Sequence, residues 1–286
     1  MYTLRIRNAD GQQITLTQAE SDYQVVKVLG LNPPPGQVNL TAIAGLDGAK
    51  FNSAKLNTRN IVITLKLCGD VEGNRQNLYR MFRTADACTV YYTNRNRNVY
   101  IEGYVETVEC DLFAMSEEMQ ISIICPDPYL KAMNMIIADI SNEVAGFHFP
   151  FSINDGEPIP FSIYIANRES LVENDSESET GMVINIAVQR DCSTIKIQNI
   201  DTGQWIAVSG TYLEGDEIYI NTNKGRKQIH LVRNGMASNI FPDLVAGSVF
   251  LQLAVGQNHF GYLVDNGAGD EFVVIQFMYR RQYRGV

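Results

Sequence analysis

Histidines and carboxylates are the side chains from which a catalytic or metal site would be built, and this sequence scatters them. Its three histidines, His148, His230 and His259, lie more than 25 residues apart, and none has a second ligand at the spacing of a zinc motif. The chain also lacks a GxSxG elbow, a Walker loop and a GxGxxG fingerprint. We therefore predict no catalytic, cofactor-binding or metal-ligating residues.

Carboxylates cluster twice along the chain. Glu214, Asp216 and Glu217 flank Gly215, and the two adjacent acids would point to opposite faces of a strand, so turn carboxylates are the better interpretation than a glycosidase pair. The run from Glu173 to Glu179 holds four acids, but it lacks the spacing and glycine of a calcium loop. An exposed, mobile loop is the expectation there.

Two further groups of residues suggest binding rather than catalysis. Arg95 and Arg97 lie between two strand-like runs, where they form either a solvated hairpin tip or a contact loop for an acidic neighbour. Trp205, Tyr212 and Tyr219 are candidate platforms for stacking sugar rings, although a lone tryptophan in a strand is more often partly buried core.

Composition narrows the class of protein. The chain has 286 residues, of which 45% are hydrophobic and 19% charged, and this composition is globular with enough length for two cores. A net charge of −9 repels the phosphate groups of nucleic acids, so nucleic-acid binding is not expected. No stretch approaches the roughly 18 apolar residues of a membrane helix, and the start of the chain is strand-like rather than a secretory signal. The five cysteines form no CxxC pair and are expected to be buried free thiols.

The hydrophobic period is two almost throughout, which predicts a mainly β protein. Alternation is clear from 60 to 67, from 99 to 105 and from 119 to 123. One exception is the segment 72–85, where Leu78, Met81, Phe82 and Ala85 recur at helical spacing. This spacing predicts a single amphipathic helix that covers a sheet.

The run from Gln120 to Leu130 marks the boundary between two units. A β-branched strand ends at Cys125 and is cut by Pro126 and Pro128, which cannot continue a central strand. We predict a β domain over 1–130, a last strand or linker over 131–145, and a β-sandwich over 146–286, where short strands alternate with turn signals.

Several phrases resemble the distal tail proteins of siphophages. The first is the strand that ends in Cys-Pro-Asp-Pro-Tyr at 125–129. Four more lie in the second unit: the strand–turn–strand Ile197–Ile206 around Thr-Gly, the strand Glu214–Asn223 with Asn221 in place of the more usual Asp, the turn Leu253–Asn258 with Val255 in place of Pro, and the basic-aromatic end Tyr279–Gly285. The resemblance covers both units and is weakest over 1–60.

This resemblance implies a structural virion protein. It implies an N-terminal β-barrel or split-barrel domain that assembles as a homo-hexameric ring, and a galectin-like C-terminal sandwich. The ring would be a baseplate or tail-tip hub that joins the tail tube protein to a tail-associated tip protein for host adsorption. Its expected location is the phage tail tip, after assembly in the cytoplasm of the bacterial host. Hubs of contractile tails fit the same phrases. The alternative is a carbohydrate-binding module that acts through the C-terminal sandwich, and a cell-envelope hydrolase is the third hypothesis.

Overall fold

The computed structural model describes residues 2–17, 21–45, 47–140, 142–144, 163–165, 169–265 and 272–286. They form a mainly β protein, which confirms the predicted fold class, and they divide into two compact units. Unit 1 comprises residues 1–133 together with 282–286, and unit 2 comprises residues 134–281.

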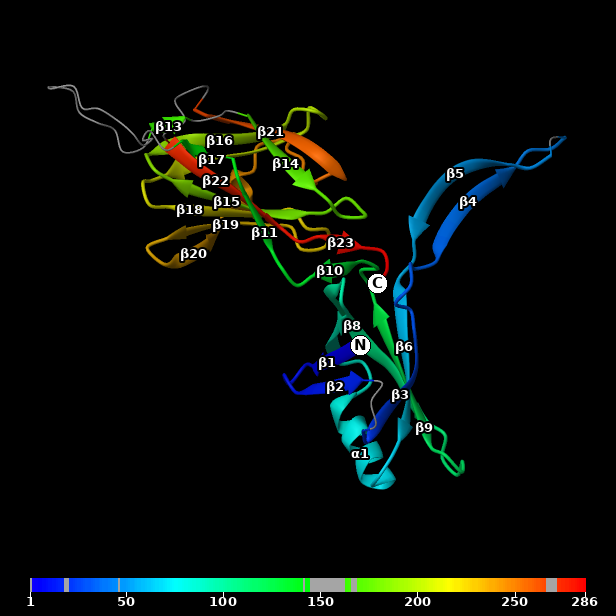
Figure 1. The fold of residues 1–286 in the computed structure, drawn as a ribbon. Helices are drawn as coiled ribbons and strands as arrows, with labels where there is room; N and C mark the ends of the chain where they lie inside the picture. Colours follow the sequence, from blue (N-terminus) through cyan, green and yellow to red (C-terminus); the bar gives the residue numbers. More distant parts are fainter. Residues whose placement is uncertain are drawn as a thin grey trace, which may run out of the picture. The chain divides into compact units, whose positions relative to one another are not determined.

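Unit 1 contains the helix α1, the strands β1 to β10 and the last strand, β23 (Figure 1). In chain order its elements are β1 (Thr3–Asn8), β2 (Gln13–Thr17), β3 (Tyr23–Leu29), β4 (Gly36–Ala42), β5 (Ala49–Leu56), β6 (Arg59–Leu67), α1 (Val71–Met81), β7 (Ala87–Thr93), β8 (Asn98–Cys110), β9 (Glu118–Cys125), β10 (Leu130–Ala132) and β23 (Gln282–Tyr283). Every pairing among these strands is antiparallel.

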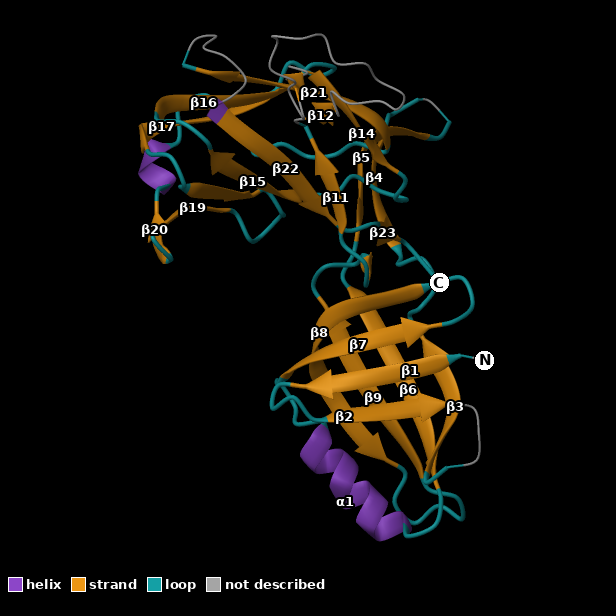
Figure 2. Cartoon of the chain, turned by 60° about the vertical axis from the view of Figure 1, so that its left-hand side comes forward, coloured by secondary structure: helices purple, strands orange, loops and turns teal. Residues whose placement is uncertain are grey.

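The long strand β8 joins two layers of unit 1. Its first half pairs with β7 and its second half with β9, and the register shifts between Val105 and Thr107. Figure 2 shows β8, β7, β1 and β2 in front of β9, β6 and β3. Gly103 permits this corner, because a Cβ there would lie 2.7 Å from the side chain of Ile123.

The core of unit 1 lies between these layers and follows the alternation in the sequence. Ile61, Ile63, Leu65 and Leu67 of β6 all point inward and are at most 4% exposed. On the far side from β8, the edge strands β2 and β3 lie close together, and a groove of about 250 Å³ separates them. The two layers therefore meet along β8 and leave a narrow gap between their other edges.

The helix is shorter than the sequence pattern predicts. It begins after the cap Asp70, whose carboxylate accepts a hydrogen bond from the Gly73 amide, and it ends at Met81. Leu78 and Phe82 are buried as expected. The expectation that Ala85 belongs to the helical face is wrong, because Ala85 has a φ of 70°, is exposed, and donates its amide to Val105.

Unit 2 is a β-sandwich of two antiparallel sheets. Its described elements are β11 (Ile136–Asp139), β12 (Asn142–Val144), β13 (Ile163–Ile165), β14 (Glu169–Asn174), β15 (Met182–Val188), β16 (Cys192–Asn199), β17 (Trp205–Tyr212), β18 (Glu217–Asn221), β19 (Gln228–Arg233), β20 (Met236–Asn239), the short 3₁₀ helix η1 (Phe241–Asp243), β21 (Gly256–Val264) and β22 (Val273–Tyr279). One sheet has the order β11-β22-β15-β18-β19-β20 and the other β14-β21-β16-β17. Phe260 and Phe277, one from each sheet, meet edge to face at 4.9 Å in the core.

The end of the chain departs from the expected division of domains. The sequence pattern places 146–286 in one domain, whereas residues 282–286 lie in unit 1. The reason is a short ladder in which Leu130 and Lys131 of β10 pair with Tyr283 and Gln282 of β23. The guanidinium of Arg97 lies 3.8 Å above the Tyr283 ring and adds to this contact.

Candidate functional site

The β4–β5 hairpin of unit 1, residues 36–56, is a two-stranded ribbon that we call the arm (Figure 1). It forms a sheet of its own, separate from both layers of the core. All of its described residues are exposed except Leu56, which is half-buried. The arm therefore has ladder hydrogen bonds within itself but no core of its own.

The arm nevertheless has an apolar face. The ladder pairs Val38 with Ala54, Leu40 with Phe51 and Ala42 with Ala49. Alternation along β4, together with a register shift in β5 opposite Asn39 and Leu40, places these six side chains on one side of the ribbon. The other side is polar, and its amide and hydroxyl groups pair across the strands: Asn39 donates to Ser53 at 2.9 Å and Asn52 to Thr41 at 2.6 Å. Leu40 and Phe51 are 57% and 60% exposed.

A two-stranded ribbon in water is marginal by itself, and clustered exposed apolar side chains mark an interaction surface. The apolar face of the arm is thus the strongest candidate functional site in the described part of the chain. It can bury side chains against another surface, and its polar face can remain in water.

The root of the arm is fixed by Arg59, which is only 1% exposed. Its guanidinium donates to four backbone carbonyls, those of Gly30, Asn32, Pro128 and Arg284. Burial lowers the pKa of Arg59, while the carboxylate of Asp127 and the Cys125 thiol act in the opposite direction. The cation is therefore held by carbonyl dipoles that belong to three separate segments.

Close packing at the root leaves no room for side chains. Gly30 has a φ of +85°, and a Cβ there would lie 1.9 Å from the carbonyl oxygen of Asn60. Next to it, a Cβ on Gly285 would lie 3.0 Å from the Pro33 ring, and the Val286 amide donates to Leu31. The last residues of the chain thus pack against the segment that leads into the arm.

The predicted contact loop of Arg95 and Arg97 lies at the β7–β8 turn. The Asn94 carboxamide accepts hydrogen bonds from the amides of Asn96 and Arg97 and shapes this turn. Arg97 lies over Tyr283 of the same unit, whereas Arg95 is exposed. A role in contacting a partner stays a prediction for both arginines.

The three aromatic residues of the glycan hypothesis do not share a face. Tyr212 is 1% exposed and donates its hydroxyl to Asp243, and burial raises its pKa. Tyr219 belongs to the other sheet and is stacked on His230 at 5.1 Å. Trp205 is half-buried, with the Lys196 ammonium 4.9 Å above its ring and the backbone at Gly247 close to its edge. The platform therefore stays a prediction that no group of adjacent rings supports.

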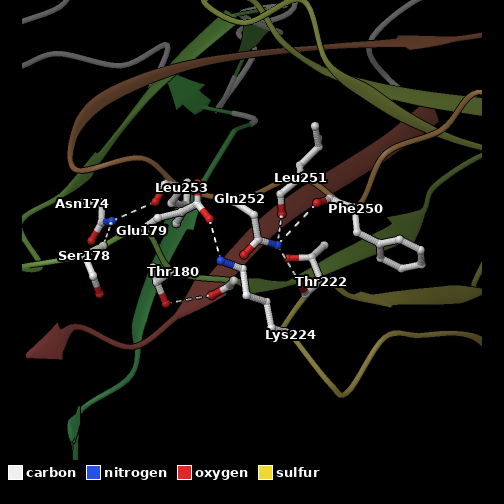
Figure 3. A network of polar contacts seen from close by, with 11 residues as sticks. Asn174, Ser178, Glu179, Thr180, Thr222, Lys224, Phe250, Leu251, Gln252 and Leu253 are labelled. Carbon is white, nitrogen blue, oxygen red and sulfur yellow. Dashed lines mark hydrogen bonds and ion pairs between the residues drawn. The ribbon is translucent and has the colours of Figure 1, made fainter. Parts of the chain in front are cut away.

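The acidic segment 173–179 is not laid out as a loop that projects from the surface. From Glu173 to Thr180 exposure alternates, with the carboxylates outside and the smaller polar residues inside. Figure 3 shows how the interior is satisfied: the Asn174 amide donates to the carbonyls of Ser178 and Leu253 at 3.2 and 3.0 Å. Lys224 pairs with Glu179 at 2.9 Å on the outside. The segment is a buried polar seam with an acidic rim.

The remaining candidate groups have structural roles as well. His259 contacts Asp201 at 2.9 Å on the surface, and the backbone and ring hydrogen bonds from His259 lower the pKa of Asp201. His148 lies outside the described residues. Among the residues described, no three His, Cys, Asp or Glu side chains gather in a way that could hold a metal ion. Burial raises the pKa of the Cys88 and Cys125 thiols to about 12, so neither would act as a thiolate nucleophile at neutral pH.

The polar residues in the resemblance phrases organise turns. Asp216 is 2% exposed, accepts the Leu213 amide and binds the Arg233 guanidinium through both oxygens, and these bonds lower its pKa. The Asn258 amide donates to the carbonyls of Ala254 and Gly256 and closes the turn before β21. Asp216 and Asn258 therefore hold turns of the sandwich in place.

Two lines of comparison identify the class of protein that this fold defines. Residues 175–283 match the family described as siphovirus-type tail component, C-terminal domain. Outside residues 175–283 the similarity to known proteins is one of fold. The family match and the fold together confirm the resemblance to siphophage distal tail and baseplate hub proteins. No curated protein matches the sequence.

The particular structures it resembles are phage tail proteins. The chain is similar to the Dit protein (gp 19.1) of phage SPP1, described as a paradigm of the hub adsorption apparatus in phages that infect Gram-positive bacteria, with 14% identity, a TM-score of 0.69 and 99% of each chain covered. It is also similar to a chain of the phage P2 baseplate in its activated conformation with Ca, with 13% identity, a TM-score of 0.55 and 100% of each chain covered. A third match is the same baseplate with Sr, at 14% identity and a TM-score of 0.55.

Proposed function

We propose that this chain is a structural hub protein of a phage tail that acts by self-association, as a homo-hexameric ring. The ring would join the tail tube protein to a tail-associated tip protein in the virion and would perform no reaction. The matched family and the fold support the general class of phage tail component. No described helix of the chain is long or apolar enough to cross a bilayer.

The apolar face of the arm is the observation that carries the self-association. Side chains such as Leu40 and Phe51 are more than half exposed on a rigidly rooted ribbon. An element of this kind gains stability only when a second surface covers it. A ring supplies such a surface at every position, because a heterologous contact that closes leaves no copy uncovered.

The test is the oligomeric state of the purified chain, measured by native mass spectrometry and light scattering over a range of concentrations. We expect a closed oligomer for the natural sequence. Leu40→Glu should shift it to monomers, because a carboxylate on the apolar face cannot be buried without a partner. Thr41→Glu adds the same charge to the polar face of the same ribbon and should assemble normally. A chain that stays monomeric at all concentrations, or equal behaviour of the two variants, would refute the proposal.

A further inference from the structure

A second exposed apolar element lies at the other end of unit 1. It is the turn between β8 and β9, residues 111–117, which we call the tip. Phe113 and Met115 are fully exposed, and Leu112 is 51% exposed. No other described hairpin turn of unit 1 displays three large apolar side chains in four residues.

The tip is held in place rather than loosely attached. The Asp111 amide donates to Glu118 and the Leu112 amide to Cys110, and Phe113 has a φ of 67°. The Arg75 guanidinium of α1 lies 3.1 Å from the Glu117 carboxylate. This anchoring holds the Phe113 ring outward, so the exposed side chains are presented and not buried against their own copy.

The tip and the arm have opposite charge. The tip holds two acids, Asp111 and Glu117, and no lysine or arginine, and Glu109 and Glu118 flank it. The arm carries Lys50, Lys55 and one acid, Asp47. A lysine has a long apolar stem, so the ammonium groups on the polar side can reach round a two-stranded ribbon to its edge. The tip is therefore complementary to the arm in charge, and both are apolar at their centres.

The two elements cannot meet within one copy. β6 separates them: Arg59 at the root of the arm pairs with Cys125, and Lys66 at the other end of the strand pairs with Glu118 beside the tip. Seven steps along the strand put roughly 23 Å between Arg59 and Lys66, and Figure 1 shows the arm and the tip of β9 extending from opposite ends of β6. Complementary surfaces on opposite ends of one unit define a head-to-tail contact between copies.

We propose that the tip of one copy packs against the apolar face of the arm of the next copy, with Phe113 beside Leu40 and Phe51. This proposal rests on the proposed self-association and identifies the two surfaces that meet in it. The acidic residues of the tip then face Lys50 and Lys55 around an apolar centre, which is the usual arrangement of an interface.

The first experiment is disulfide trapping between two separately tagged variants of the full chain. One copy carries Phe113→Cys and the other Leu40→Cys, and the mixture is oxidised and run without reductant. We expect a linked pair that contains both tags. Tyr79→Cys, an exposed aromatic position on α1, replaces Phe113→Cys as the control for reaction with the natural cysteines and should give no such pair.

The second experiment measures the concentration at which half of the chains assemble. Phe113→Glu should raise it about tenfold or more, as expected for an interface anchor, and Tyr79→Glu should leave it unchanged. Asp111→Lys and Lys50→Glu should each raise it about two- to fivefold, and the two together should restore it.

The outcomes separate the two proposals. If Leu40→Glu prevents assembly while Phe113→Glu assembles normally and no disulfide forms, the arm has another partner surface and the tip contact is wrong. If the natural chain never assembles, both the ring and this contact are wrong. Trapping together with the restored charge pair would establish the contact.

Discussion

The arm and the acidic segment invert the usual relation between side-chain chemistry and burial. The arm exposes leucine and phenylalanine, and the segment 173–180 buries asparagine, serine and threonine. Both are regular: the side chains of the arm alternate between its two exposed faces, and those of the segment alternate between the outside and the inside. The difference lies in their partners. The buried polar groups have carbonyls of the same unit to bond, whereas the exposed apolar groups of the arm contact one another and are left uncovered by the described residues. Under the proposed self-association, the buried polar contacts are complete within one chain, and the exposed apolar side chains would be covered by a second copy.

The largest effect on stability should come from Arg59, which fixes the root of the arm. Replacing it with methionine leaves four carbonyls without their donor, so unit 1 should lose about 3–5 kcal/mol of its free energy of unfolding. Hydrogen exchange of unit 1 peptides, followed by mass spectrometry, would measure the loss. Arg59→Lys keeps the charge without the fork of donors and should lose less. Unchanged protection in Arg59→Met would mean that the carbonyls find other donors.

Next in size is the buried seam of the acidic segment. Asn174→Ala removes the donor for the Ser178 and Leu253 carbonyls, which should cost unit 2 about 2 kcal/mol. Urea unfolding can be followed through Trp205, the only tryptophan of the chain, which lies in unit 2. Glu177→Gln changes the exposed rim of the same segment and should stay within about 0.5 kcal/mol. Equal effects of the two changes would contradict the division into seam and rim.

The buried carboxylate of Asp216 gives the sandwich a pH dependence of intermediate size. Hydrogen bonds from Arg233 lower its pKa in the folded state below the ordinary value of 3.8. The unfolded chain therefore binds the proton first, so the contribution is present above that value and is lost as the pH falls through the folded-state pKa. Unit 2 should therefore lose stability from this group as the pH falls below about 3.8. Asp216→Asn should be less stable at neutral pH and should lack this part of the acid dependence.

The smallest effect on stability should come from the arm itself. Phe51→Ser removes an apolar side chain that is 60% exposed, so the unfolding free energy of the monomer should change by less than about 0.5 kcal/mol. Assembly should nevertheless weaken, because the lost contact belongs to the oligomer. A variant that unfolds easily as a monomer would show instead that the arm packs on its own copy.

Alternation in the sequence predicted much of the fold. The strand expected over 60–67 is β6, and its four alternating residues form the core. The spacing of Leu78 and Phe82 predicts the helix but not its end. After Met81 the chain forms a turn, and hydrogen bonds between this turn and β8 prevent the helix from continuing. The spacing of apolar side chains shows which face of a helix or strand is buried. The residue at which the element ends depends instead on hydrogen bonds with backbone groups that are distant in the sequence.

The candidate site was harder to predict for the same reason. Residues 38–42 and 49–51 alternate as a strand should, and this signal indicates the hairpin but not its exposure. Nothing local distinguishes Arg59 from a surface arginine, since its four acceptors come from residues 30, 32, 128 and 284. The sequence favours an exposed loop for the acidic segment, because its buried partners, Leu253 among them, are remote in the sequence.

Residues 282–286 belong to unit 1, so this unit cannot complete its fold until they have been synthesised. The ribosome makes β10 and the root of the arm early, but the strand that pairs with β10 and the carbonyl of Arg284 emerge only after the whole of unit 2. A nascent chain, or one cut short before residue 282, lacks these contacts and holds the arm less firmly. Because β23 follows the whole of unit 2 in the sequence, we expect unit 1 to complete its fold only after unit 2 has been synthesised.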